Sequence, residues 1–138
     1  MVRALILDSE ALNALARPSE RPVLAQRARA ILRVAYDEGA LVRVPAPVLA
    51  ELCRGSPADA ALNRILNGRG IVVVELAANA ARRAGALLAR ARLGSAHAVD
   101  AFVVATALEF GSSVIATGDP DDIGRLSAGF RDVRLFAI

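Results

Sequence analysis

Four acidic residues of this 138-residue chain stand where their carboxylates could do chemistry together. They are Asp8, Glu51, Asp100 and Asp119. Asp8 ends an apolar run that starts at Arg3, and Asp119 comes two residues after the β-rich run Val114–Thr117. Because the carboxyl ends of parallel strands meet at one edge of a sheet, we expect these two side chains to lie close together.

The other two acids belong to predicted helices with apolar faces. Apolar residues follow Asp100 at the spacings i+3, i+4 and i+7, so its carboxylate falls on an inward helix face. Glu51 stands in a similar apolar segment, Pro47–Leu52. An unpaired acid on a buried face is costly, and neither residue has a simple structural reason for its place. We therefore expect both buried carboxylates to take part in a site.

Carboxylates that converge in this way need cations or protons between them. Two of them about 5 Å apart repel by roughly 3 kcal/mol at an effective dielectric constant of about 20, and four repel several times more. A divalent cation relieves this repulsion and takes an oxygen ligand from each acid. The chain has no cluster of Cys or His, so the expected cofactor is Mg²⁺ or Mn²⁺ rather than Zn²⁺. Such an ion can activate water for attack on a phosphodiester.

The basic residues exclude several other kinds of chemistry. All 17 are Arg, the chain contains no Lys, and His97 is its one histidine. A Schiff base, a P-loop lysine and a receiver-domain lysine are therefore excluded. A metal-free ribonuclease mechanism that uses two imidazoles is excluded as well. Setting the four acids aside leaves 10 of 14 acidic residues against 17 Arg, a balance of +7 that favours a polyanion such as RNA.

Strands alternate with helices along the chain. The expected strands are Arg3–Leu7, Leu41–Val44, Ile71–Glu75, Val114–Thr117 and Val133–Phe136. The expected helices are one after Ser9 that carries Leu12 and Leu15, then Val23–Glu38, Pro47–Arg54, Pro57–Leu66, Asn79–Leu93, Ala96–Phe110, and a short one that opens at Asp119 and Pro120. The continuous β-branched run at Ile71–Glu75 is typical of a strand that is buried on both faces. The alternation predicts an α/β fold with a mainly parallel sheet and helices on both faces.

Length and composition indicate one folded unit. The chain has the length of one domain, and 55% hydrophobic with 22% charged residues is typical of a packed globular protein. We therefore expect a single domain over residues 1–138. The lone Cys53 makes no internal disulfide, and no apolar run reaches the length of a membrane span. We expect a soluble, cytoplasmic protein without a membrane partner.

Three segments carry a resemblance to a known family: LDSEAL near the start, then PAPVLAELCRG, and VDAFVVATALEFGSSVIATGDPDDI. Together they resemble the PIN-domain ribonucleases of the VapC toxin type, over nearly the whole chain. The resemblance implies a five-stranded sheet of order 3-2-1-4-5 and a homodimer. It also implies an RNA substrate, often tRNA or ribosomal RNA, and a VapB-type antitoxin that inserts a segment into the acidic site.

The resemblance also assigns roles to residues. It makes the four acids the catalytic metal ligands, and it makes Ser9 and Thr117 hydroxyls that support them. Ala46 departs from the family pattern, because relatives often carry Ser or Thr there. Glu51 therefore lacks the polar neighbour that such a residue would provide.

Helix capping is an alternative interpretation for several of these acids. Asp8 could cap the first helix, although Ser9 can serve there too. Asp119 could equally cap the helix that follows it. Asp121 and Asp122 fall in the first turn of that helix, where the helix dipole favours any carboxylate. Of these two, Asp122 is the better candidate for a fifth metal ligand, which could act through a water molecule.

Three neighbours of the acids have open interpretations. His97 lies one helical turn before Asp100 and could reach a substrate phosphate or a metal ligand, or it could be a partly buried histidine with an ordinary partner. Arg54 closely follows Glu51 and could contact RNA, or it could be a solvated arginine. Cys53 is best interpreted as a small buried apolar residue.

Three functions are compatible with parts of this pattern. The first is a Mg²⁺- or Mn²⁺-dependent endoribonuclease that acts as the toxin of a toxin–antitoxin pair. The second is a PIN-like module that binds RNA or protein without cutting, which the complete set of acids disfavours. The third is an α/β phosphatase, which is disfavoured because the segment after Asp8 lacks the second Asp of a DxD motif.

Overall fold

The computed structural model describes residues 1–68 and 70–138 and has a parallel sheet at its centre. Within this part of the chain, the strands are β1 (Ala4–Leu7), β2 (Leu41–Pro45), β3 (Ile71–Val74), β4 (Ser113–Thr117) and β5 (Val133–Ala137). Their order is β3-β2-β1-β4-β5, and each neighbouring pair is parallel. The predicted α/β class is confirmed, and so is the strand order implied by the resemblance.

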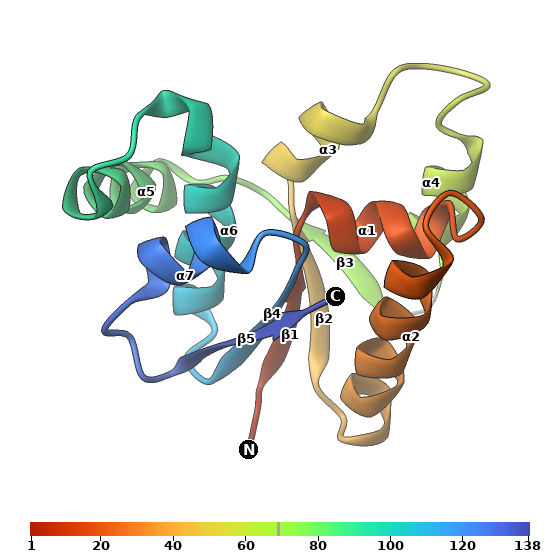
Figure 1. Cartoon of the computed structure of the whole chain (residues 1–138), viewed down its shortest axis with the longest axis horizontal. Coiled ribbons are helices and arrows are strands. Elements are labelled where there is room, and N and C mark those ends of the chain that lie inside the picture. The colour runs from red at the N-terminus through yellow and green to blue at the C-terminus, as the bar shows by residue number, and fades with distance from the viewer. Residues whose placement is uncertain (69) are drawn as a thin grey trace.

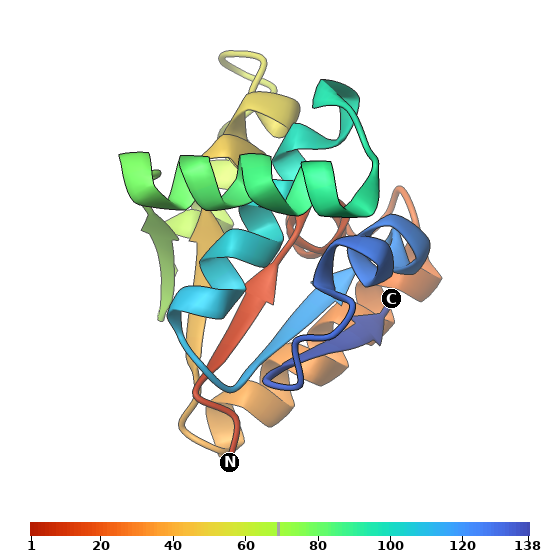
Figure 2. The same cartoon turned by 90° about the vertical axis from the view of Figure 1, so that its left-hand side faces the viewer.

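Helices cover both faces of the sheet (Figure 1, Figure 2). The described helices are α1 (Ser9–Ala16), α2 (Pro22–Asp37), α3 (Pro47–Leu52), α4 (Ala60–Leu66), α5 (Ala78–Ala91), the short 3-10 helix η1 (Ser95–His97), α6 (Ala98–Glu109) and α7 (Pro120–Ser127). α1, α2 and α4 lie on one side of the sheet, whereas α6 lies on the other with α5 and α7 packed against it. α3 contacts both α1 and α6, so it connects the two layers near the ends of the strands.

Local sequence signals place the ends of several helices. Pro22, Pro47 and Pro120 stand in the first turn of α2, α3 and α7, where a missing backbone N–H leaves no helical hydrogen bond unmade. Gly39 follows α2 with φ +70°, and Gly111 follows α6 with φ +72°. This left-handed conformation suits glycine and ends both helices.

One predicted helix begins later than its sequence pattern indicates. The pattern places a start at Pro57, but α4 begins at Ala60. The Asp59 carboxylate accepts the N–H of Arg54 at 2.8 Å and the N–H of Gly55 at 3.0 Å. These bonds close a turn over the residues that the pattern assigns to the helix.

The prediction that the third strand is buried on both faces is wrong. β3 lies at the edge of the sheet, beside β2 alone among the described strands. Val72 is 48% exposed, whereas Ile71, whose side chain points to the opposite face, is buried. A run of β-branched residues fits an edge strand equally well, because its composition does not specify how many neighbours the strand has.

α6 lies in the middle of the molecule and supports the carboxyl edge of the sheet. It contacts β1, β2 and β4 on one side and α5 and α7 on the other. Its buried residues are Ala101, Val103, Val104, Ala105, Thr106 and Ala107. This burial on several sides explains why the helix is almost entirely apolar, and it fixes the position of Asp100 in the first turn.

None of the helices within residues 1–68 and 70–138 combines the length and the apolar character that crossing a bilayer requires.

Candidate metal centre

A pocket of about 290 Å³ opens at the carboxyl edge of the sheet. Its lining residues are Asp8, Ser9, Glu10, Glu51, Asp100, Gly118 and Asp119. The structure therefore brings together all four acids that the sequence singled out, from the β1–α1 junction, α3, α6 and the β4–α7 turn. The parallel pairing of β1 with β4 sets the first and last of them side by side, since the Asp8 N–H donates to the Ala116 carbonyl at 3.2 Å.

Asp8 is buried, with 4% of its surface exposed, and several donors surround its carboxylate. The Ala11 N–H donates to Oδ1 at 2.9 Å, and the Gly118 N–H donates to Oδ2 at 3.2 Å. The Thr117 hydroxyl makes a further hydrogen bond to it. Burial outweighs these three donors and raises the pKa of Asp8 from 3.8 to about 6.

Asp100 stands in the first turn of α6, where the helix dipole favours a carboxylate. Its pKa is nevertheless raised from 3.8 to about 6. Burial is the largest cause, and the charges of Asp119, Asp8, Glu51 and Asp122 follow in that order. Asp100 thus shares its electrostatic neighbourhood with four other carboxylates, and a divalent cation would remove the repulsion among them.

The prediction that Glu51 lies on a buried helix face is wrong, because Glu51 is exposed. α3 is a short helix in which Val48 is the buried residue, and Glu51 near its end lines the pocket instead. The Ser9 hydroxyl donates to Oε1 of Glu51. Ser9 therefore provides the polar support that Ala46 does not. Of the two possible caps of α1, Asp8 is the one observed, which leaves the Ser9 hydroxyl available for this contact.

Thr117 lies between two of the acids at the end of β4. It is fully buried, hydrogen-bonds to Asp8 through its hydroxyl, and accepts the Asp119 N–H at 2.8 Å. Asp119 is the N-cap of α7, with Oδ1 accepting the Asp122 N–H at 3.3 Å. Capping is thus observed for both Asp8 and Asp119. It does not compete with metal binding, since a carboxylate has about four acceptor sites and capping uses one of them.

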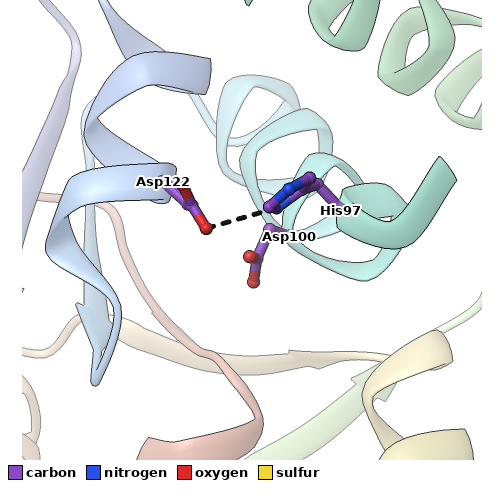
Figure 3. A group of neighbouring side chains, drawn as sticks. All are labelled: His97, Asp100 and Asp122. Carbon is purple, nitrogen blue, oxygen red and sulfur yellow. Dashed lines mark ion pairs between the residues drawn. The ribbon is translucent and has the colours of Figure 1, made fainter. Parts of the chain in front are cut away.

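His97 and Asp122 meet beside Asp100 (Figure 3). The His97 Nδ1 lies 3.2 Å from Oδ2 of Asp122, and both side chains are partly exposed. One nitrogen of His97 and one carboxylate oxygen each of Asp100 and Asp122 lie within 4.8 Å of one another. His97 therefore has an acidic partner, and Asp122 is drawn into the neighbourhood of the acids, whereas Asp121 is exposed.

Arg54 and Cys53 make structural contacts near the end of α3. The Arg54 Nη1 donates to the carbonyls of Ala50 at 3.1 Å and Cys53 at 2.6 Å, at the end of α3. The guanidinium therefore satisfies helix carbonyls, and contact with RNA stays a prediction. Cys53 is a free thiol that packs against the hydrophobic core, as expected for a small apolar residue.

Glu10 and Gly118 line the pocket, although the sequence analysis did not single them out. The Glu10 side chain lies over Gly118, so closely that a Cβ at position 118 would come 1.4 Å from Oε2 of Glu10. Oε1 of Glu10 pairs with Nη1 of Arg21 at 3.2 Å. The sequence could have indicated Glu10, because it stands two residues after Asp8, in the first turn of the helix that Asp8 caps.

The donor set fits a hard divalent cation. Asp8, Glu51, Asp100 and Asp119 present carboxylate oxygens to one pocket, which is the ligand chemistry that Mg²⁺ and Mn²⁺ prefer. Three of the four acids stand at helix N-termini, whose positive ends reduce the cost of gathering the charges. Part of that cost remains in the raised pKa of Asp100, to which the charges of Asp119, Asp8 and Glu51 contribute after burial.

The fold and the pocket together define an α/β protein with a carboxylate site at the carboxyl edge of a parallel sheet. A family model of the PIN domain matches residues 5–128, which include all four acids. The chain therefore belongs to the PIN domain family.

Solved structures share this fold at low sequence identity. One is a chain of the crystal structure of VapBC2 from Rickettsia felis bound to a DNA fragment from their promoter, with 14% identity and a TM-score of 0.68 over 98% of each chain. Another is a chain of a toxin–antitoxin complex from Klebsiella pneumoniae, with 20% identity and a TM-score of 0.65 over 97% of this chain and 99% of that chain. No curated protein matches the sequence.

Proposed function

We propose that the protein is a metal-dependent endoribonuclease. The observation that carries this proposal is the convergence of Asp8, Glu51, Asp100 and Asp119 on one pocket. The residues come from segments far apart in the chain, so their meeting is a property of the fold rather than of local composition. Membership of the PIN domain family supports the same conclusion.

The four acids would hold the cation, and the hydroxyls of Ser9 and Thr117 would orient the carboxylates of Glu51 and Asp8. A bound Mg²⁺ or Mn²⁺ supplies Lewis acidity, which lowers the pKa of a water molecule and neutralises charge on a phosphodiester. In the hydrolysis, the water oxygen joins phosphorus, the bond from phosphorus to the 3′-oxygen breaks, and a proton goes to that oxygen. The products carry a 5′-phosphate and a 3′-hydroxyl. Attack by a ribose 2′-hydroxyl would give a cyclic phosphate instead.

We further propose that the nuclease is a VapC-type toxin whose substrate is a structured RNA such as tRNA or ribosomal RNA. Structures described as VapBC2 and as a toxin–antitoxin complex share the fold over almost the full chain, which supports this role. The partner would be a VapB-type antitoxin, and the active form would be a homodimer in the cytoplasm. The excess of Arg over the acids outside the site, +7, favours a polyanionic substrate.

A second cavity, of about 250 Å³, adjoins the acidic pocket and suits the antitoxin role. It is bounded by α1, α2 and α3, and it shares Ser9, Glu10 and Glu51 with the pocket. Its remaining lining mixes apolar residues with charged ones, including Leu24 and Arg21. A segment of an antitoxin placed here would reach the acids and close the pocket. A short reading frame immediately upstream, encoding a DNA-binding amino end and an Arg-bearing tail, would support this partner.

The test is RNA cleavage by the purified protein, freed of any partner. We expect cleavage with Mg²⁺ or Mn²⁺, none with EDTA, and 5′-phosphate with 3′-hydroxyl ends by mass spectrometry of the fragments. Asp8→Asn and Asp100→Asn should lose activity by at least about a hundredfold, since each removes a charged ligand. Asp121→Asn is the matched control, because Asp121 is an exposed acid that does not line the pocket.

Two results would contradict this function. Equal cleavage in EDTA would exclude the metal mechanism. Absence of cleavage by wild-type protein on a panel of tRNA and ribosomal RNA, together with intact binding of Mn²⁺ and RNA, would favour a PIN module that binds without cutting.

A further inference from the structure

We propose that Arg17 and Asp59 are positioning residues that hold Glu51 in the acidic pocket. They act through the segment that follows α3, and neither of them lines that pocket. The inference rests on the proposed function in one respect, namely that Glu51 is a metal ligand. It does not require that RNA is cleaved, so metal binding alone can test it.

Glu51 needs support from outside its own helix. α3 has six residues, of which Val48 is the buried one, and Leu49 and Leu52 are only partly buried. A helix of this length is not stable by itself, so its position depends on contacts at its two ends. Glu51 is exposed, and within the described residues the Ser9 hydroxyl is the one hydrogen-bond donor to its carboxylate.

The Asp59 carboxylate closes the segment between α3 and α4, residues 53–59. Oδ1 accepts the Arg54 N–H at 2.8 Å, and Oδ2 accepts the Gly55 N–H at 3.0 Å, directly after the end of α3. The Arg54 N–H is the main cause that lowers the pKa of Asp59, and the Gly55 N–H and the Arg17 guanidinium add to it. The carboxylate is therefore ionised at neutral pH and accepts both hydrogen bonds.

Arg17 connects this segment to the end of α1. Nη2 of Arg17 donates to the Ala58 carbonyl at 2.9 Å, and Nη1 donates to Oδ1 of Asn13 at 2.6 Å. The second bond fixes the guanidinium against α1, because Asn13 belongs to that helix and Arg17 is its C-cap. In Figure 1, the chain leaves α3, arches outward and returns to α4 beside the end of α1.

α1 thus contacts the chain on both sides of the end of α3. At its start Ser9 donates to Glu51, and at its end Arg17 donates to Ala58. α1 is itself fixed, because Asp8 caps it and five of its eight residues are buried. Without the contacts of Arg17 or Asp59, the end of α3 would be free to move, and Glu51 would bind a cation less tightly.

Binding of Mn²⁺ to the metal-free full chain, measured by calorimetric titration, tests the proposal. Arg17→Ala and Asp59→Ala should each raise the dissociation constant by about tenfold, as expected for residues that orient a metal ligand. The two substitutions change the net charge in opposite directions, and loss of a positive charge by itself favours cation binding. Weaker binding by both variants therefore reports lost positioning rather than altered charge. Unchanged or tighter binding by Arg17→Ala would overturn the proposal.

A double-mutant cycle determines whether the effect passes through Glu51. In a Glu51→Gln background, Arg17→Ala should change the dissociation constant by less than about twofold. The same loss in both backgrounds would show that Arg17 supports the fold in general, and it would refute the positioning role. Arg64→Ala, which removes an exposed arginine of α4, is the matched control and should bind Mn²⁺ as the wild type does.

Amide hydrogen exchange, followed by NMR without metal, measures the contacts of Asp59 directly. The N–H groups of Arg54 and Gly55 should lose their protection in Asp59→Ala. The Leu12 N–H, which donates to the Asp8 carbonyl, should keep its protection and show that the variant is folded. Unchanged exchange of the first two N–H groups would overturn the role of Asp59.

RNA cleavage separates this proposal from the proposed function. Arg17→Ala should need about ten times more Mn²⁺ for half-maximal cleavage, and it should keep the wild-type rate at saturating Mn²⁺ to within about twofold. A wild-type protein that binds Mn²⁺ but cuts no RNA would refute the nuclease and leave the positioning role standing. A nuclease whose Arg17→Ala variant binds Mn²⁺ normally would refute the positioning role alone.

Discussion

Asp8 combines a structural role with a place in the acidic pocket. It caps α1 through the Ala11 N–H, and it connects β1 to the β4–α7 turn through the Gly118 N–H. These donors hold the carboxylate in one orientation. Burial nevertheless destabilises its charged form. The effect of burial exceeds that of the hydrogen bonds, so the pKa of Asp8 is raised to about 6. The residue therefore favours a proton or a cation close to neutral pH.

The first prediction concerns stability against pH without metal. The folded pKa of Asp8, about 6, lies above the ordinary value of 3.8, so between these values the folded state binds more protons than the unfolded state. Stability therefore falls as pH rises through this window. For Asp8 alone, the free energy of unfolding should drop by about 1 kcal/mol between pH 5 and pH 7. Asp100, whose pKa is also raised to about 6, acts in the same direction.

Thermal unfolding in EDTA at pH 5, 6 and 7 measures this effect. Asp8→Asn should reduce the dependence without abolishing it, because the amide does not titrate whereas Asp100 still does. Saturating Mn²⁺ should reverse it, since protons compete with the metal for the same oxygens. A metal-free wild-type protein that is most stable at pH 7 would contradict the expected sign.

The second prediction concerns the contact of Glu10 with Gly118. A Cβ at position 118 would lie 1.4 Å from Oε2 and 2.8 Å from Cβ of Glu10. Gly118→Ala must therefore move the first turn of α1 away from the β4–α7 turn, at a cost of about 1–3 kcal/mol. Chemical denaturation and Mn²⁺ binding should both register the shift. Adding Glu10→Ala should recover part of the loss, because it removes the carboxylate but keeps the Cβ at 2.8 Å, and purely additive effects would show that the two side chains do not interact.

The sequence identified the site residues better than it predicted their burial and their hydrogen-bond partners. The strand ends near Asp8 and Asp119 and the apolar spacing after Asp100 were enough to select three acids. The exposure of Glu51 was not predictable, because the periodicity of a helix of one or two turns does not show where the helix ends relative to the core. The partners of Ser9 and His97 are 42 and 25 positions away in sequence, so only the fold reveals them.

At the scale of elements, α5 and α7 are joined by arginines that cap each other's helix ends. Nη2 of Arg90 on α5 donates to the carbonyls of Leu126 at 3.1 Å and Ala128 at 2.6 Å. Arg125 on α7 donates to the Ala91 carbonyl at 3.0 Å. This layer holds α7, and thus Asp119 and Asp122, against α6.

The third prediction is that Arg90 stabilises this layer. Its guanidinium also lies 4.5 Å above the Phe130 ring. Arg90→Ala should lower the free energy of unfolding by about 1–2 kcal/mol, and Arg90→Lys should recover little of it, because an ammonium cannot reproduce the planar donors and stacking. Urea unfolding measures both.

Arg83 is an exposed arginine of the same helix, and Arg83→Ala is the matched control. This substitution should change stability by less than about 0.5 kcal/mol. Equal effects at positions 83 and 90 would contradict the assignment.

Element types followed from sequence more reliably than element environments. The predicted starts at Pro47 and at Asp119 and Pro120 agree with α3 and α7, whereas the helix predicted to reach Arg54 ends at Leu52. β3 was placed correctly but its burial was not, because the number of neighbours of a strand is set by sheet order. The late start of α4 depends on the contacts of Asp59, which a helical period does not encode.

At the scale of the whole molecule, the acids come from parts of the chain that lie far apart in sequence and meet only in the folded state. Asp8 follows the first strand and Asp119 follows the fourth, and α3 and α6 supply the other two. An unfolded chain has no such site, so a bound cation stabilises the folded state alone. Metal binding and folding are therefore coupled across the entire sheet edge.

The fourth prediction follows from this coupling. At pH 7 and a free Mn²⁺ concentration about 100 times the dissociation constant, the folded state should gain about 2.7 kcal/mol. For a protein of this size, the midpoint of thermal unfolding should rise by about 8 °C, and EDTA should reverse the rise. Asp119→Asn should reduce the shift strongly because it removes a ligand from the β4–α7 turn, whereas Asp121→Asn two positions later should keep it. If both variants kept the full shift, the ion would be bound elsewhere, and the convergence of the acids would have another cause.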